Sequence, residues 1–311
     1  MSRQHSKPQK AYKNLEFLNS PDARVIRLIS EFLEPARRFR QQSVRDTIVF
    51  FGSARTRPRR EVLSKLKRLQ RRAQGVKSAS KAVQRAIEAA QVDLEVSRYY
   101  EDAVKLARLL TEWSKKLYQQ NRFVICSGGG PGIMEAANRG AKLAGGRSIG
   151  LNISLPFEQS ANKFVTNGLD FEFHYFFMRK FWFVYLAKAL VMFPGGFGTM
   201  DEIFEVLTLL QTGKIKKKMT VLLYGKAYWE EVLNFQKLVD LHMISPDELK
   251  LFTFADSPEE AYRYLIKELK RNYPNETTES NGVLSGPGQL PLAGWRRRQM
   301  PQLRISRKRL Y

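Results

Sequence analysis

A glycine-rich turn, Pro194-Gly195-Gly196-Phe197-Gly198-Thr199, holds the residues of this chain best suited to binding a ligand. It follows the apolar run 189–193 and precedes a helical pattern over 203–211. Glycines allow positive φ and close approach of a ligand. The free N–H groups at the start of a helix attract an anion. The turn therefore predicts phosphate binding by Gly195, Gly196, Gly198 and Thr199.

Glu202 lies one turn into the same helix. A carboxylate beside a phosphate site is unusual, because the two anions repel each other. The simpler interpretation is an acidic residue in the first turn, where it complements the helix dipole. Taken alone, this stretch supports both interpretations equally.

A second glycine turn, 127–132, follows the apolar run 122–126, and Ser53 follows the similar run 47–51. Turns at the carboxyl ends of parallel strands meet in one crevice. Gly129 and Gly130 are therefore further candidate phosphate ligands. The turn lacks the acidic residue that should follow a dinucleotide fingerprint, and it lacks the Gly-Lys-Ser/Thr of a P-loop. A mononucleotide or sugar phosphate fits the pair of turns better than a dinucleotide.

Arg179 and Lys180 are cations within a very aromatic helical pattern, 177–186. A basic side chain near buried surface needs an anionic partner, unless its charged end reaches water. The planar guanidinium of Arg179 suits phosphate or carboxylate. Glu135 follows the second turn and either complements a helix dipole or contacts a ribose. The weaker candidate substrate contacts are Ser53, Glu135, Met178 and Lys180.

These residues need a scaffold in which strands alternate with helices. Strands are expected over 47–51, 122–126, 148–153, 171–176, 188–193, 219–224 and 251–254. Helices are expected over 22–40, 97–119, 133–144, 177–186, 203–211, 228–241 and 258–271, with Asp22 and Ser257 as caps. This alternation predicts an α/β fold: a doubly wound, parallel, Rossmann-like sheet in a single domain. Cys126 ends a strand and is expected in the core, and His174 is expected in a strand near the site.

The net charge of +23 over 311 residues is carried by appendages. The expected organisation is an N-terminal extension over 1–45 with a loose start and one helix, a catalytic domain over 46–271, and a disordered basic tail over 272–311. Within the domain, 56–96 is expected to form an inserted basic helical hairpin, broken at Gly75. Such appendages can contact nucleic acid non-specifically. The simpler interpretation is a pair of solvated helices and a solubilising tail, with 214–218 as a solvated loop.

Other classes of protein are disfavoured by composition. No apolar run is long enough to cross a membrane, and the start of the chain has no signal-peptide core. One cysteine and three scattered histidines argue against a disulfide framework or a metal site. A cytoplasmic protein without metal or cofactor is expected.

With these motifs in place, the sequence resembles the longer branch of the Lonely Guy (LOG) family, which is often mislabelled as lysine decarboxylases. The signature Pro-Gly-Gly-x-Gly-Thr-x-x-Glu is matched over 194–202, and the Arg-Lys pair at Arg179-Lys180. The run Ser-Gly-Gly-Gly-Pro-Gly-Ile-Met-Glu over 127–135 also looks like that branch. The resemblance covers roughly 46–271, and the appendages depart from it.

The resemblance implies a phosphoribohydrolase that cleaves a cytokinin riboside 5′-monophosphate or AMP into free base and ribose 5-phosphate. It makes Arg179 and Glu202 the catalytic pair and implies a homodimer or larger homo-oligomer. From the residues alone, Arg179 could pair either with Glu202 or with the phosphate. Two alternatives stay open: a non-enzymatic nucleotide carrier on the same fold, and an RNA-associated protein that uses its basic segments.

Overall fold

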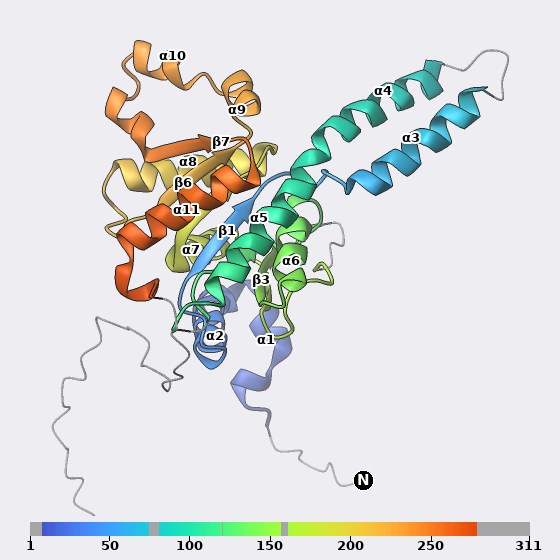
Figure 1. The fold of residues 1–311 in the computed structure, drawn as a ribbon. Helices are drawn as coiled ribbons and strands as arrows, with labels where there is room; N and C mark the ends of the chain where they lie inside the picture. Colours follow the sequence, from blue (N-terminus) through green and yellow to red (C-terminus); the bar gives the residue numbers. More distant parts are fainter. Residues whose placement is uncertain (1–7, 75–80, 120, 157–160, 279–311) are drawn as a thin grey trace, which may run out of the picture.

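The computed structural model describes residues 8–74, 81–119, 121–156 and 161–278. Its centre is one seven-stranded parallel sheet with the strand order β4-β3-β2-β1-β5-β6-β7 (Figure 1). The strands are β1 (Thr47–Phe51), β2 (Val124–Ser127), β3 (Ser148–Ile153), β4 (Asp170–Phe173), β5 (Ala187–Met192), β6 (Thr220–Tyr224) and β7 (Phe252–Ala255). The expected α/β doubly wound fold is confirmed.

The order of the strands reverses at β1. From β1 the chain builds outward through β2, β3 and β4 on one side, and returns to pair β5 with the other side. Doubly wound sheets bind ligands at such a switch point, outside the carboxyl ends of the strands. The three turns that follow β1, β2 and β5 therefore meet at one edge.

The alternation of side chains along β1 divides the core into two layers. Ile48 and Phe50 face one layer of helices, and Val49 and Phe51 face the other. The first layer is formed by α5 (Arg98–Ser114), α6 (Ile133–Leu143) and α11 (Pro258–Asn272). The second is formed mainly by α2 (Arg24–Gln41), α7 (Phe176–Leu186) and α8 (Phe197–Gln211). Strands buried on both faces explain their nearly continuous apolar sequences.

The insertion after β1 forms two helices, α3 (Arg59–Gln74) and α4 (Lys81–Val96), which project from the body of the protein (Figure 1). They bury few side chains: Val62 and Leu66 of α3, and Ala90 of α4. The expected break at Gly75 lies outside the described residues.

Three local expectations need correction. The start of the chain is not wholly loose, because Ala11–Lys13 and Leu15–Asn19 are helical. Asp22 does not cap α2, which begins at Arg24 without a side-chain cap. The helix expected over 228–241 is two helices, α9 (Lys226–Val232) and α10 (Phe235–Asp240), because the Asn234 side chain caps a new start. Ser257, by contrast, caps α11 as expected.

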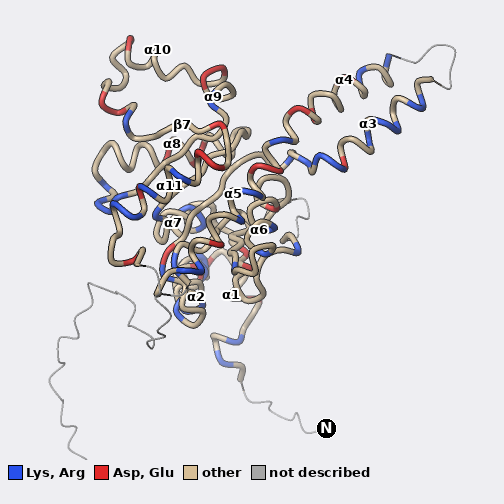
Figure 2. The backbone as a smooth tube through the Cα atoms, viewed as in Figure 1, with Lys and Arg blue, Asp and Glu red and all other residues tan. Residues whose placement is uncertain are grey.

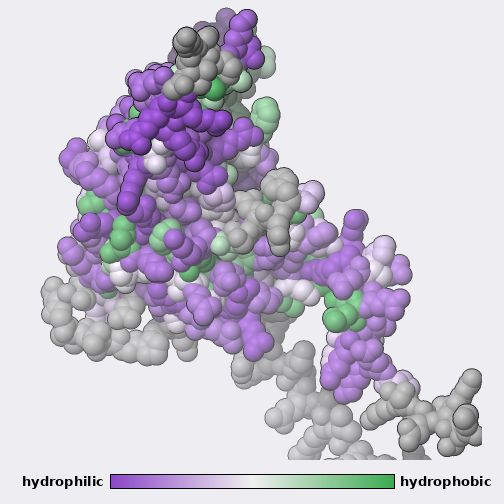
Figure 3. Space-filling model, turned by 90° about the vertical axis from the view of Figure 1, so that its right-hand side faces the viewer, coloured by the Kyte–Doolittle hydropathy of each residue, from purple (hydrophilic) through white to green (hydrophobic). Residues whose placement is uncertain are grey.

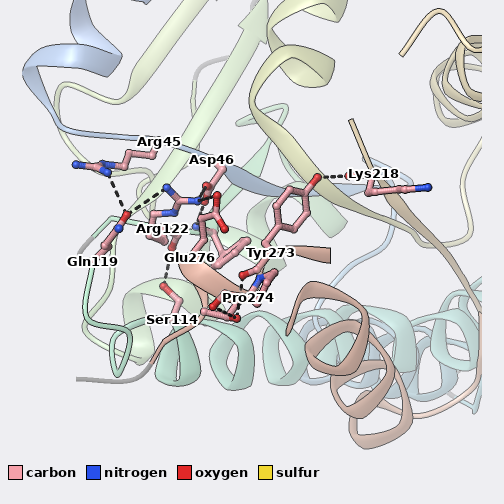
Figure 4. Close-up of polar contacts among 11 residues, drawn as sticks. Arg45, Asp46, Ser114, Gln119, Arg122, Lys218, Tyr273, Pro274 and Glu276 are labelled. Atoms are coloured by element: carbon pink, nitrogen blue, oxygen red, sulfur yellow. Dashed lines mark hydrogen bonds and ion pairs between the residues drawn. The ribbon is translucent and has the colours of Figure 1, made fainter. Parts of the chain in front are cut away.

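A polar cluster closes the opposite, amino-terminal edge of the sheet (Figure 4). Asp46 pairs with Arg122 at 2.6 Å, and both side chains are almost fully buried. Burial raises the pKa of Asp46 and lowers that of Arg122, while their mutual attraction opposes both shifts. Glu276 lies 3.7 Å from the same guanidinium. The pairing holds together the segments that lead into β1 and β2.

This cluster also fixes part of the expected tail. Tyr273 is buried and its hydroxyl donates to the Lys218 carbonyl, while the Tyr118 N–H donates to the Thr278 carbonyl. Disorder is therefore wrong for 272–278, and 279–311 lie outside the described residues. The loop over 214–218 is not wholly solvated either. Lys217 Nζ donates to the carbonyls of Val184 and Tyr185, and burial lowers its pKa to about 7.

Candidate active site

A cavity of about 830 Å³ opens at the carboxyl edge of β1, β2 and β5. That size is typical of pockets that enclose a small organic ligand. Its polar or glycine lining comes from all three turns and from the three helices α7, α8 and α9. The residues are Gly52, Ser53, Arg55, Gly128, Arg179, Gly195, Gly196, Gly198, Thr199, Glu202 and Tyr228.

The start of α8 presents unused donors to this cavity. Among the described residues, the N–H groups of Gly196, Phe197 and Gly198 form no backbone hydrogen bond, whereas Thr199 N–H already donates to the Gly196 carbonyl. The helix dipole adds positive potential at the same place. This end of the cavity is therefore suited to an anion.

The sequence offers two reasons for glycine in this turn, positive φ and close approach of a ligand. The structure does not bear out the first. None of Gly195, Gly196 and Gly198 has φ in the left-handed region. A Cβ at Gly196 or Gly198 would meet nothing within 4 Å, so packing of the described residues does not require glycine there. A Cβ at Gly195 would lie 2.1 Å from Thr199 Oγ1. Packing against Thr199 therefore requires glycine at 195, whereas Gly196 and Gly198 leave open space beside the free N–H groups.

Ser53 joins the three turns. Its N–H donates to the Pro194 carbonyl at 3.0 Å, and its carbonyl accepts from Ile133 N–H at 3.0 Å. The backbone of Gly132, at φ +71°, passes so close to Ser53 that a Cβ would lie 2.2 Å from the Ser53 carbonyl oxygen. The relative position of the turns is thus fixed by backbone contacts, and the Ser53 hydroxyl remains at the cavity.

Glu202 is the most unusual group of the site. Its side chain is 5% exposed, and it forms no hydrogen bond or ion pair within 4 Å in the described part of the chain. Burial raises its pKa to about 7, although Arg179 and Lys180 attract the carboxylate and oppose the shift. A buried carboxylate without a hydrogen-bonded partner costs free energy. Such a group at a cavity wall is a candidate for chemistry on a ligand.

Arg179 reaches the same cavity from α7. Its Nε donates to the Leu151 carbonyl at 2.8 Å, and its guanidinium carbon lies 5.0 Å from the centre of the Phe183 ring. Burial lowers its pKa, and attraction to Glu202 opposes that shift. Gly128 makes room for it, because a Cβ there would lie 2.6 Å from Arg179 Nη2.

Gly129 and Gly130 do not line the cavity, although they belong to the same turn as Gly128. Their carbonyls accept hydrogen bonds from Asn162 Nδ2 at 2.9 and 3.0 Å. Gly129 has φ +72° and lies against the Gly150 backbone. These contacts give both glycines a role in shaping the turn that carries Gly128.

The structure does not bring Glu135, Met178 and Lys180 into the cavity wall. Glu135 accepts a hydrogen bond from the Tyr100 hydroxyl at 2.7 Å. Lys180 pairs with Asp201 at 2.7 Å and Glu205 at 2.9 Å, which ties α7 to α8. Met178 packs against the core layer that contains α7.

Sequence reasoning missed the far wall of the cavity. Tyr228, at the start of α9, donates its hydroxyl to the Gly195 carbonyl at 2.5 Å and so supports the glycine turn. Tyr228 follows β6, at the same edge of the sheet as the other turns, and this position in the sequence could have identified it as a cavity residue. Phe197 is 96% exposed at the mouth. The apolar lining is completed by Phe51, Met134, Met200, Val232 and Leu233.

The remaining candidates lie elsewhere. Cys126 is in the core, as expected, and burial raises the pKa of its thiol. His174 follows β4, and its N–H donates to Glu31 Oε1 at 2.7 Å. The described residues contain no group of three or more His, Cys, Asp or Glu side chains arranged to hold a metal. None of their helices is long and apolar enough to cross a membrane.

Comparison with known proteins supports the family resemblance. A family model described as "Possible lysine decarboxylase" matches residues 134–265. The chain is 38% identical over 80 residues to a cytokinin riboside 5′-monophosphate phosphoribohydrolase of Arabidopsis thaliana, covering 25% of this chain and 36% of that protein. It is 27% identical over 178 residues to a probable enzyme of the same name from Oryza sativa subsp. japonica, covering 56% and 66%. The chain thus spans about a third to two thirds of these relatives, and the resemblance to the LOG family is confirmed.

Two solved structures are similar to part of this chain. A molybdenum cofactor binding protein from Rippkaea orientalis is 23% identical, with a TM-score of 0.37 over 55% of this chain and 87% of that chain. A Moco carrier protein from Chlamydomonas reinhardtii is 19% identical, with a TM-score of 0.38 over 56% and 89%.

Proposed function

We propose that this protein hydrolyses the N-glycosidic bond of a nucleoside 5′-monophosphate, releasing the free base and ribose 5-phosphate. The observation that carries the proposal is Glu202. It is a buried carboxylate, unpaired among the described residues, in the wall of a cavity whose other end is the start of α8. The curated relatives named as phosphoribohydrolases support the same activity.

Glycosidic cleavage passes through an oxocarbenium-like state, with positive charge on the ribose. The ionised Glu202 stabilises that charge and takes a proton from the attacking water. The water oxygen bonds to C1′, the bond from C1′ to the base nitrogen breaks with its electron pair leaving on the base, and the base takes up a proton. Arg179 acts here by favouring the ionised form of Glu202.

The phosphate end and the base end of the ligand bind to different parts of the cavity. The free N–H groups at Gly196, Phe197 and Gly198, with the Thr199 hydroxyl, bind the 5′-phosphate. The Gly129-Gly130 part of the second turn supports Gly128 and thereby Arg179. The apolar wall that contains Val232 and Leu233 receives the base. This wall suits adenine or a prenylated adenine, so AMP and cytokinin riboside monophosphates are the proposed substrates.

A nucleotide carrier on the same fold is the alternative. It would need the phosphate-binding turn but would gain nothing from Glu202, whose burial without a partner is unfavourable. The site therefore favours the enzyme. We place the activity in the cytoplasm, where a chain with one buried cysteine needs no oxidising conditions.

A homodimer is also part of the proposal. The described helices α2 and α7 expose large apolar side chains side by side, and the Phe32 and Phe181 rings lie 5.5 Å apart. The exposed members are Val25, Ile26, Ile29, Phe32, Leu33, Phe176, Phe177, Phe181 and Tyr185. Because α7 also carries Arg179, pairing of two copies on this face would place the second copy near the site. Light scattering of the wild type and of Phe32→Glu/Phe181→Glu tests this; a monomeric wild type contradicts it.

The activity test is direct. Purified protein is incubated with AMP, other nucleoside monophosphates and a prenylated AMP, and free base is measured by chromatography. Release of base by the wild type is expected, with a loss of roughly 10² to 10⁴-fold in Glu202→Gln. Glu88→Gln removes an exposed carboxylate of α4 that lies outside the cavity, and this matched control keeps its activity. No base from the wild type at high enzyme concentration would exclude the hydrolase; full activity in Glu202→Gln would exclude the mechanism.

A further inference from the structure

The hairpin formed by α3 and α4 concentrates its cations on one helix. Helix α3 carries seven Lys or Arg residues and one acidic residue, whereas α4 carries two basic and three acidic residues. Figure 2 shows the basic positions running along α3. A helix pair that was only solvated would gain from cross-pairing of opposite charges. Within the described hairpin, Lys65 and Asp93, at 3.0 Å, form the only ion pair.

Three of the cations outside that ion pair share one face of α3. Val62 and Leu66 are buried and mark the side that packs inward. Arg60, Lys67 and Arg71 follow one another at seven and four residues, which places them on a common face of a helix. That face lies opposite Val62 and Leu66, and Arg68 flanks it. All four cations are exposed, and the stripe from 60 to 71 is about 16 Å long.

The stripe begins beside the candidate active site. Ser53, Ala54 and Arg55 line the cavity, and α3 starts four residues later at Arg59. The Arg59 N–H donates to Glu101 Oε1 at 3.1 Å, which fixes the root of the hairpin to α5. The basic surface therefore projects from the rim of the cavity into solvent (Figure 1).

The kind of partner follows from what the hairpin lacks as well as from its charge. Of its large apolar side chains, Val92 alone is strongly exposed among the described residues, at 59%. The face of the molecule from which the hairpin projects is mostly hydrophilic (Figure 3). A membrane-surface helix needs a broad exposed apolar face, and base stacking needs aromatic rings; α3 presents neither to solvent. A regular row of arginines and lysines suits a repeating phosphate backbone.

From this geometry we infer that α3 binds the phosphate backbone of double-stranded nucleic acid, independently of base sequence. Arg60, Lys67, Arg68 and Arg71 make the contacts, and the hairpin holds them clear of the body. The inference does not depend on the proposed hydrolase, because none of these residues lines the cavity. It also gives the insertion a function where the sequence alone favoured a simple solvated pair.

The test compares two full-length variants with equal loss of charge. Lys67→Gln/Arg68→Gln/Arg71→Gln removes three cations from the stripe. Lys214→Gln/Lys216→Gln/Lys237→Gln removes three exposed lysines elsewhere. Glutamine keeps the helix propensity of the residues it replaces. Cations outside α3, including those of 296–311, are retained in the stripe variant. Circular dichroism and thermal unfolding verify that both variants are folded.

Binding of a labelled DNA duplex of about 20 base pairs is followed by anisotropy between about 50 and 200 mM salt. We expect the stripe variant to bind at least about tenfold more weakly at the lowest salt, with a log–log salt slope smaller by about three. The control keeps the wild-type slope within about one. Equal losses in both variants, or an unchanged slope in the stripe variant, would overturn the inference. So would wild-type protein that binds anionic phosphatidylserine vesicles or single strands but not the duplex.

Discussion

Arg179 and Glu202 face the same cavity without forming a direct ion pair. Arg179 donates instead to the Leu151 carbonyl at 2.8 Å, while Glu202 is 5% exposed. Each still influences the other through its charge. Both groups line the cavity, and the carboxylate, which has no ion pair among the described residues, is free to act on a ligand there.

The first prediction concerns the pH dependence of hydrolysis. Burial raises the pKa of Glu202 to about 7, and the proposed mechanism needs the ionised form. We expect kcat/KM to rise with pH through about 7. In Arg179→Gln the rise should move to higher pH, because the attraction that lowers the pKa of Glu202 is lost. Profiles of kcat/KM against pH measure both effects. A profile that falls through pH 7 would contradict the assigned role.

Because the pKa of Glu202 is raised, the stability of the protein should also change with pH. The folded state holds the Glu202 proton more tightly than the unfolded chain, where the ordinary pKa is 4.5. Its contribution is therefore fully present below about 4.5 and is lost as pH rises to about 7. Glu202→Gln should lose less stability than the wild type between those values. Urea unfolding at a series of pH values tests this, with Glu88→Gln, at an exposed carboxylate of α4, as the comparison.

Substitutions at two glycines of the turn are expected to have different effects, one on substrate binding and the other on stability. Gly198→Ala has open space for its Cβ and lies in a helix, so stability should be unchanged or raised by up to about 1 kcal/mol. If the phosphate lies against this backbone, KM for AMP should rise. Gly195→Ala should instead destabilise the fold, because its Cβ would clash with Thr199. Thermal unfolding and steady-state kinetics distinguish the two. An unchanged KM in Gly198→Ala would place the phosphate elsewhere.

Tyr228 supports the glycine turn through a single hydrogen bond to the Gly195 carbonyl. Tyr228→Phe removes that bond and keeps the ring, so we expect a loss of about 1 kcal/mol in the free energy of unfolding. If the turn holds the phosphate, KM should rise more than kcat falls. Tyr12→Phe, at a strongly exposed tyrosine outside the cavity, serves as the control. Unaltered kinetics in Tyr228→Phe would show that the turn is held by its other contacts.

The buried pair at the opposite edge of the sheet predicts a purely structural effect. Asp46→Asn leaves the buried Arg122 with only the more distant Glu276 carboxylate at 3.7 Å, so we expect a loss of about 3 kcal/mol in the free energy of unfolding. Asp247→Asn breaks the exposed pair with Lys250 and should change stability little. Chemical denaturation compares them. Because the Asp46–Arg122 pair lies far from the cavity edge, folded Asp46→Asn should keep its kcat.

The succession of the seven strands could be predicted from the sequence, because strands buried on both faces are continuous apolar runs and glycine turns mark the ends of three of them. The sequence also determined which motifs meet, since parallel strands bring their carboxyl ends to one edge. Which side chains pair with one another could be seen only in the tertiary structure. Lys180 pairs with Asp201 and Glu205 rather than facing the cavity, and Tyr228 reaches it from a helix with no recognisable motif. Such contacts join residues far apart in the chain, so no local pattern encodes them. The burial that sets the pKa of Glu202 depends, for the same reason, on how α8 packs against its neighbours.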